Sequence, residues 1–265
     1  MKLGELEIQH GLLEAVRKAK LRLLKMHYES GVGHIGGNLS SLDLLIYLFH
    51  RVLGEDDRFV LSKGHAAGSL YVALWSIGKL SDSDLQQFHK EGTKLSGHPA
   101  SGWIPEIDFS TGSLGHGLSL AAGLGLGKML MSQSGQIYCL MSDGEWNEGS
   151  NWEALIFAAH HKLSNLTFII DANHLQGFGT TREVANLDSI ANKFRSFGVP
   201  THEIDGHNLL EISQCFSESK RGLNAIVANT KKGSGISFME NKMEWHYLPM
   251  TELQYIRAVE EVSKQ

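Results

Sequence analysis

The sequence predicts an α/β fold with a doubly wound, mostly parallel sheet, and three observations support this prediction. Short apolar runs recur along the 265 residues, helical patterns lie between them, and no low-complexity linker or internal repeat divides the chain. Such alternation is typical of parallel sheets covered by helices. The length suits one large α/β domain or two small ones, and we expect one domain spanning residues 1–265. The expected strands are Phe59–Leu61, Ile137–Met141, Leu166–Ile170 and Ala225–Ala228.

Helix starts are marked by pairs that resemble capping boxes, in which two side chains satisfy the free N–H groups of a first turn. The pairs are Ser40 with Asp43, Ser81 with Asp84, and Thr251 with Gln254. We expect a helix from Leu118 to Met131, whose several glycines indicate close packing because glycine costs helix stability. A last helix is expected from Thr251 to Val262.

Composition narrows the class of protein. The net charge of −5 and the absence of a Lys/Arg run disfavour a nucleic-acid partner. The two cysteines, Cys139 and Cys215, do not form a disulfide framework, so a reducing cytoplasm is the simpler interpretation. We expect no membrane span, because no stretch approaches the ~20 apolar residues that one requires, and the first residues lack an apolar signal segment.

The stretch from Ile137 to Leu175 is the most informative. It reads as strand, turn, helix and strand, so Asp143 and Asn173 should emerge together at the carboxyl edge of the sheet, where α/β folds bind ligands. A carboxylate and an amide oxygen suit Mg²⁺, which would also need phosphate and water oxygens. The alternative is an ordinary βαβ unit in which both side chains only cap turns.

Histidine follows glycine five times, where random pairing would give about 29 × 14 / 265 ≈ 1.5. A single such histidine is more often a surface or capping residue, but several in turns suggest a shared polar pocket. Their spacing does not match a zinc site. The five are His34, His65, His98, His116 and His207.

A glycine-rich turn, Thr111–Gly117, leads into the expected helix at Leu118. The free N–H groups and positive dipole end of a helix start favour a diphosphate. The turn lacks the Gly-x-Gly-x-x-Gly order after a strand, so a dinucleotide site is disfavoured.

Together these motifs resemble transketolases. The motifs, in the order of that family, are Ser62-Lys63-Gly64-His65-Ala66, Gly97-His98-Pro99, Thr111-Gly112-Ser113-Leu114-Gly115, Ser142-Asp143-Gly144, Glu148-Gly149, Asn173, Lys232-Gly233 and Trp245-His246. The likeness covers nearly the whole chain and corresponds to the first of three transketolase domains, which holds the diphosphate of thiamine diphosphate. It therefore implies the N-terminal subunit of a split transketolase.

The resemblance also implies roles for individual residues. Mg²⁺ would be held by Asp143, Asn173 and the carbonyl of Leu175. The cofactor would be contacted by His65, Gly112, Ser113, Leu114, Gly144, Asn173, Lys232 and His246. The substrate channel would be lined by His34, His98 and His246, which would bind hydroxyls and relay protons. Glu148 resembles the buried acid that links two active sites across the dimer.

The sequence departs from the family at three places. Ser142 replaces the usual glycine, Ile35-Gly36-Gly37 follows His34 where proline is common, and His116 stands where glutamine is common. None of these removes a ligand.

The resemblance implies a partner as well, because the glutamate that activates the cofactor's pyrimidine ring lies in a second domain that no segment here matches. We expect a C-terminal transketolase subunit to supply it, in a heterotetramer built around two copies of this chain, and sugars or sugar phosphates to be the substrates. Two alternatives stay open. One is a subunit of another thiamine enzyme, such as a 2-oxo-acid dehydrogenase alpha subunit or a deoxyxylulose phosphate synthase relative. The other is a non-catalytic cofactor-binding protein.

Overall fold

The computed structural model describes residues 3–218 and 222–265, and the chain divides into two compact units. Unit 1 consists of Met1–Val52, His65–Gly97 and Lys231–Gln265, and unit 2 consists of Leu53–Gly64 and His98–Thr230. Each unit is therefore assembled from segments that are distant in the sequence. The assignment of residues 1–265 to a single domain stays a prediction.

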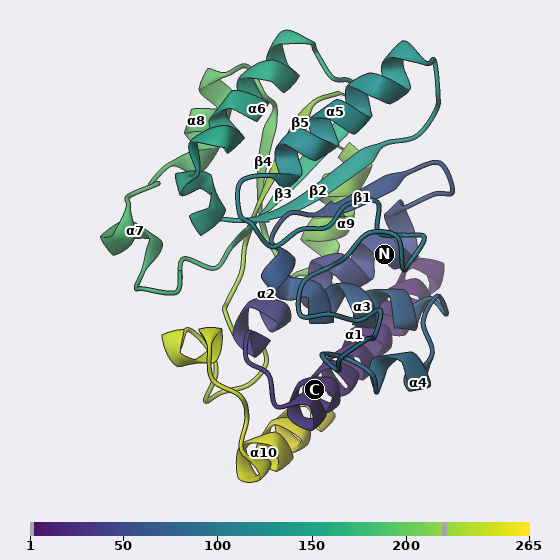
Figure 1. The fold of residues 1–265 in the computed structure, drawn as a ribbon, viewed down its shortest axis with the longest axis vertical. Coiled ribbons are helices and arrows are strands. Elements are labelled where there is room, and N and C mark those ends of the chain that lie inside the picture. The colour runs from purple at the N-terminus through teal and green to yellow at the C-terminus, as the bar shows by residue number, and fades with distance from the viewer. Residues whose placement is uncertain (1–2, 219–221) are drawn as a thin grey trace. The chain divides into compact units, whose positions relative to one another are not determined.

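Unit 2 contains a five-stranded sheet in the order β1-β2-β3-β5-β4, and every strand pairs in parallel with its neighbour (Figure 1). The strands are β1 (Arg58–Leu61), β2 (Ile137–Ser142), β3 (Leu166–Ala172), β4 (Thr201–Asp205) and β5 (Asn224–Asn229). The predicted α/β class and parallel sheet are confirmed, and four strands lie where the apolar runs placed them. The sequence analysis missed β4, an edge strand in which only Ile204 is buried.

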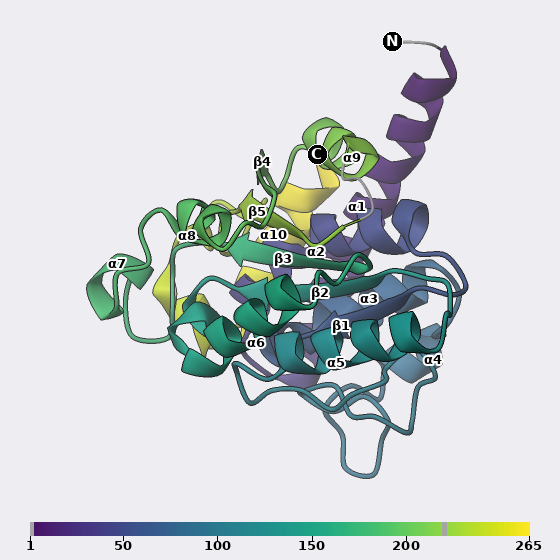
Figure 2. The same cartoon turned by 90° about the horizontal axis from the view of Figure 1, so that it is seen from above.

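Helices cover both faces of this sheet (Figure 2). On one face α5 (Gly117–Leu130), α6 (Gly149–His160) and α8 (Ile190–Ser196) pack into a single apolar core, and α9 (Leu209–Glu218) lies on the other side. The core takes alternate residues from the strands, as a pleated sheet requires. From β2 and β3 these include Cys139, Met141, Phe168 and Ile170. The short helices η3 (Gly144–Asn147) and α7 (Thr181–Val184) follow β2 and β3.

Unit 1 is helical. It contains α1 (Leu3–Ser30), α2 (Ile35–Tyr47) with its continuation η1 (Leu48–Val52), α3 (Ala67–Ser76), α4 (Asp82–Leu85), η4 (Met243–His246) and α10 (Glu252–Ser263); the single turn η2 (Gly64–Ala66) crosses the boundary between the units. Helix α1 packs against α2, α3 and α10. The stacked rings of Tyr28 and Tyr255, with centroids 4.4 Å apart, join α1 to α10.

Two of the three predicted capping boxes are confirmed. Ser81 and Asp84 cap α4, and Thr251 and Gln254 cap α10. The third is wrong, because Ser40 and Asp43 are buried inside α2, which begins five residues before Ser40. In the described part of the chain, both cysteines are free and buried, and no helix is long and apolar enough to cross a membrane.

Candidate active site

Unit 2 brings Asp143 and Asn173 to the same edge of the sheet. Ser142 at the end of β2 is in register with Asp171 of β3, so the two chain segments leave the sheet side by side. The Asp143 carboxylate then reaches across, because its Oδ2 accepts a hydrogen bond from the His174 N–H at 2.6 Å. Asn173 Oδ1 accepts from the Leu175 N–H at 3.1 Å. The three predicted metal ligands therefore lie around one turn.

Asp143 is buried and receives only neutral donors. Its Oδ1 accepts from Gly144 N–H at 2.7 Å, and Oδ2 also accepts from Thr181 Oγ1 at 3.1 Å. No basic side chain of the described residues forms an ion pair with it. Burial, and secondly the nearby charge of Asp171, raise the pKa of the Asp143 carboxyl. A cation at this position would relieve both effects.

Asp171 has a different environment, although it lies next to Asp143. Its side chain is fully buried and forms an ion pair with the buried ammonium of Lys63. Thr230 Oγ1 donates to the other carboxylate oxygen, Oδ1, and Asn173 Nδ2 donates at 3.4 Å to Oδ2, the oxygen that pairs with Lys63. The sequence analysis assigned no role to Lys63 or Asp171. The only signal available was that Lys63 belongs to a motif and Asp171 ends an apolar strand.

The glycine-rich turn of unit 2 lies against the Ser62-Lys63-Gly64 segment. A Cβ on Gly64 would lie 2.6 Å from the Gly112 amide nitrogen, so these backbones touch. Gly112 has φ +135° and a Cβ there would lie 2.8 Å from His98 Cδ2, so only glycine fits without strain. His98 and the predicted Gly112–Leu114 segment are thus neighbours within unit 2.

Some of the backbone N–H groups at the start of α5 already donate hydrogen bonds to protein side chains. Gly117 N–H donates to Ser62 Oγ at 3.2 Å, and Gly115 N–H donates to Glu145 Oε1 at 2.9 Å. Ser62 Oγ in turn donates to the same carboxylate oxygen. Glu145 is fully buried, and burial raises the pKa of its carboxyl. The sequence analysis did not identify Glu145, which joins the glycine-rich turn to the turn after β2.

A cavity of 510 Å³ opens beside Asp143 in unit 2. Its lining includes Thr181 of α7, Ser189 and Ala191 at the start of α8, and Asn229 at the end of β5. It therefore lies at the carboxyl edge of the sheet, the edge at which parallel α/β sheets bind ligands.

Unit 1 contains a histidine cluster made of His34, His65 and His246. The ring centroids of His34 and His65 are 5.0 Å apart, those of His34 and His246 are 5.5 Å apart, and both pairs meet edge to face. The His34 N–H donates to the His246 carbonyl at 3.1 Å. Tyr247 borders this histidine cluster, with its ring 4.5 Å from that of His246.

Lys232 is buried against this histidine cluster. Its Nζ lies 3.0 Å from His246 Nδ1. An ammonium group only donates, so Nδ1 must accept and the ring proton of a neutral His246 must sit on Nε2. A Cβ on Gly36 would lie 2.9 Å from Lys232 Cγ, so this glycine makes room for the lysine stem. The Gly36-Gly37 pair departs from the family pattern, and this contact gives a steric reason for the glycine at position 36.

The chain matches the family model described as "Transketolase, thiamine diphosphate binding domain" over residues 14–261. The chain belongs to this transketolase family. The resemblance stated from the motifs is therefore confirmed.

Two of the similar proteins are single subunits of transketolases. One subunit of an apulose-4-phosphate transketolase from Phocaeicola vulgatus is 37% identical, over 94% of this chain and 92% of its own length. One subunit of a 6-deoxy-6-sulfo-D-fructose transketolase from a Clostridium species is 36% identical, over 98% of each chain. Human transketolase is 33% identical, and this chain spans 42% of its length. The prediction of a transketolase subunit of the N-terminal type is confirmed.

Solved transketolases have the same fold. The enzyme from Campylobacter jejuni superposes with a TM-score of 0.87 at 27% identity, over 95% of this chain and 42% of that one. The enzyme from Leishmania mexicana superposes with a TM-score of 0.90 at 23% identity, over 95% of this chain and 41% of that one, which shows the shared fold. These findings favour transketolase over the two other thiamine enzymes considered from the sequence.

The predicted transketolase site residues fall into two groups. Unit 2 holds His98, Gly112–Leu114, Asp143, Gly144, Asn173 and Leu175, and unit 1 holds His34, His65, Lys232 and His246. Gly144, predicted to contact the cofactor, donates its N–H to Asp143 in this structure. Glu148, predicted to act at a dimer interface, is exposed in the single chain.

Proposed function

We propose that this chain is the diphosphate-binding subunit of a thiamine diphosphate- and Mg²⁺-dependent transketolase. The complete enzyme would transfer a two-carbon ketol unit from a ketose to an aldose. The observation that carries the proposal is the position of the Asp143 carboxylate against the Asn173–Leu175 turn, at the carboxyl edge of a parallel sheet. The family membership supports the same conclusion.

The donor set fits Mg²⁺. Asp143, Asn173 and the Leu175 carbonyl offer oxygens only, which hard divalent cations prefer. No group of three or more His, Cys, Asp or Glu side chains in the described residues could hold a metal ion. The cation would therefore need further oxygens, and a diphosphate offers them.

The remaining residues would position the cofactor and substrate. His65 and Lys232 would neutralise the diphosphate, Gly112–Leu114 and Gly144 would contact the cofactor, and the cofactor, when bound, would supply the electron sink for the ketol carbanion. The other roles belong to the histidines. Neutral imidazoles can both donate and accept protons near pH 7, which suits His34, His98 and His246 for hydroxyl binding and proton relay during cleavage and transfer.

We further propose that catalysis requires a C-terminal transketolase subunit carrying the ring-activating glutamate. This proposal is supported by relatives that are named as single subunits and match this chain over nearly their whole length. Two copies of each chain would form a heterotetramer, in which the exposed Glu148 lies between two copies of this chain. We place the complex in the cytoplasm, with sugars or sugar phosphates as substrates.

Calorimetry on the assembled complex tests the cation site. Asp143→Ala should weaken Mg²⁺-dependent thiamine diphosphate binding by more than about 10²-fold, because even residues that only orient metal ligands are worth 10–100-fold. Asp188→Ala is the matched control, since Asp188 lines the same cavity but is 61% exposed and pairs with Arg182. Unchanged cofactor affinity in a folded Asp143→Ala complex would exclude this site.

A mixing experiment tests the requirement for a second subunit. The purified chain alone should show little ketol transfer and weak cofactor binding, and addition of the partner should restore both. Mass measurement of the mixture should give a heterotetramer. Full ketol transfer by the isolated chain would refute the requirement for a partner.

A further inference from the structure

Asn38 lies in the first turn of α2, one turn after His34, and is 1% exposed. Its own backbone N–H makes the ordinary helical hydrogen bond to the His34 carbonyl at 3.1 Å. The side chain makes a second one, from Nδ2 to the same carbonyl at 2.8 Å. His34 has φ +65°, a left-handed conformation that a non-glycine residue adopts only when its surroundings hold it there.

The same amide group also reaches the start of α3. Asn38 Nδ2 donates to the His65 carbonyl at 3.1 Å, and Asn38 Oδ1 accepts from the Ser69 N–H at 2.7 Å. Ser69 Oγ returns a hydrogen bond to the Asn38 carbonyl at 2.7 Å. Two carbonyls on one side and an N–H on the other fix the orientation of the amide without ambiguity.

This arrangement supplies a cap that α3 lacks. The residue at its N-cap is Ala66, which has no side chain able to accept a hydrogen bond. The free N–H of Ser69, in the first turn, is satisfied instead by Asn38 from a different helix. A Cβ on Gly68 would lie 3.0 Å from Asn38 Oδ1, so the amide sits directly on the helix start.

We propose that Asn38 is a positioning residue that fixes His34 and His65 relative to each other. It holds the carbonyl of each histidine with one NH₂ group, and the two rings meet at 5.0 Å and 81°. The proposal rests on the proposed function, in which His34 binds substrate and His65 binds the diphosphate. Asn38 itself touches neither and acts through the two backbones.

The chemistry of the site selects asparagine. The position needs two donors and one acceptor on a short stem, and asparagine provides all three. Aspartate has the same shape and keeps the acceptor for Ser69 but loses both donors, and it would direct a carboxylate at two carbonyl oxygens. Asn38→Asp is therefore the sharpest variant, and Asn38→Ser, which removes the repulsion, is the second.

The control is Asn165→Asp. Asn165 is also a buried asparagine whose Nδ2 donates to a backbone carbonyl, that of Gly125 at 3.0 Å, but it lies in unit 2 at the start of β3. It carries the same change of chemistry without contact to a predicted site residue.

The experiment measures ketol-transfer kinetics of the assembled complex and the NMR titration of histidine rings in the full chain. We expect Asn38→Asp and Asn38→Ser to lower kcat for ketol transfer by up to about 10²-fold, since a misplacement of about 1 Å can cost this much. We also expect the titration curves of His34 and His65 to shift in both variants. Asn165→Asp should change neither measurement.

Wild-type kinetics and unshifted His34 and His65 titrations in a folded Asn38 variant would overturn the proposal. An equal loss in Asn165→Asp would also overturn it, because the effect would then be general destabilisation. If the proposed function itself is wrong, the wild-type complex will lack ketol transfer, an outcome that differs from failure of the Asn38 proposal. The titrations of His34 and His65 would then still decide whether Asn38 positions the two rings.

Discussion

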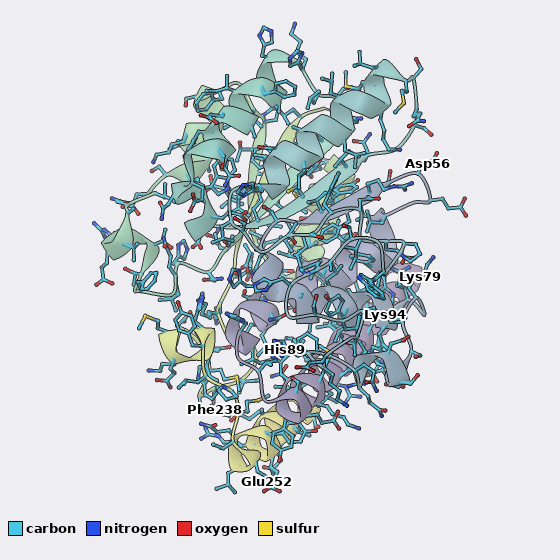
Figure 3. All side chains as sticks on the ribbon, viewed as in Figure 1. Asp56, Lys79, His89, Lys94, Phe238 and Glu252 are labelled. Carbon is cyan, nitrogen blue, oxygen red and sulfur yellow. The ribbon has the colours of Figure 1, made fainter. Side chains whose placement is uncertain are left out.

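Acidification should destabilise this chain through one buried histidine, His27 of α1. Its ring is 2% exposed, lies 5.4 Å from the Phe88 ring, and has neither nitrogen in a hydrogen bond of good geometry. Burial lowers the pKa of His27 to about 4, and the nearby backbone of Val32 and Gly33 offsets part of this shift. The charges of His34 and His89 add a small further decrease; of these two residues, Figure 3 labels His89.

The sign and size of the effect follow from this pKa. The unfolded state, with the ordinary pKa of about 6.5, takes up a proton first, so stability is lost as the pH falls from about 6.5 towards 4. A difference of about 2.5 pKa units corresponds to a total loss of roughly 3 kcal/mol, of which about 2 kcal/mol is lost between pH 7 and pH 5.

Urea unfolding of the purified chain at pH 7 and pH 5 measures this loss. In His27→Leu the loss should be smaller by about 2 kcal/mol than in the wild type. An apolar side chain forfeits no hydrogen bond at this position. His160→Leu, at an exposed histidine of α6, should retain the wild-type pH dependence. Parallel pH dependence in the wild type and His27→Leu would show that His27 is not the group responsible.

Three further predictions concern the site. His34→Ala and His246→Ala should each lower ketol transfer by about 10²–10⁴-fold with the complex still assembled, and wild-type rates in both would show that the substrate channel lies elsewhere. Gly112→Ala should lower the free energy of unfolding by about 1–3 kcal/mol, because Gly112 has a positive φ. Gly123→Ala is the control: its new methyl group would lie in open space on α5, so it should raise the free energy of unfolding by up to about 1 kcal/mol. Urea titration of the isolated chain measures both changes. Lys232→Met should release His246 from the Nε2–H tautomer, which ring ¹⁵N shifts report, and an unchanged tautomer would contradict the assigned contact.

The sequence predicted the fold to the extent that local patterns determine it. Four strands are continuous apolar runs because they are buried on both faces of the sheet. Strand β4, Thr201–Asp205, lacks such a run because only Ile204 of its residues is buried, whereas the other edge strand, β1, is largely buried. The Ser40–Asp43 pair has the spacing of a capping box, yet it lies inside the buried helix α2, which begins at Ile35, so packing overrides the local signal.

The candidate site was predicted only in part, for a related reason. Asp143 and Asn173 follow the ends of two strands, and their spacing can be recognised in the sequence. Asn38 carries none, because its partners His65 and Ser69 lie 27 and 31 residues away and accept or donate through their backbones. Backbone groups have no sequence signature, so residues that act by holding them are found only once the helices are placed.

The buried charges of unit 2 add an argument for a cation that is independent of the ligand spacing. Among the described residues, Asp143, Glu145 and Asp171 are all buried near the carboxyl edge of the sheet, and the buried ammonium of Lys63 pairs with Asp171. Glu145 and Asp143 each accept three hydrogen bonds, one from a hydroxyl group and two from backbone N–H groups. Burial raises the pKa of both carboxyls, but the charge of Lys63 opposes this increase at Glu145, whereas the charge of Asp171 adds to it at Asp143, which pairs with no basic side chain of the described residues. A buried carboxylate without a nearby opposite charge is costly unless a cation binds it. The carboxylate with this unfavourable burial, Asp143, is the one that the resemblance assigns to Mg²⁺. An unfavourably buried carboxylate is expected in a site that is completed by a bound ion and its diphosphate.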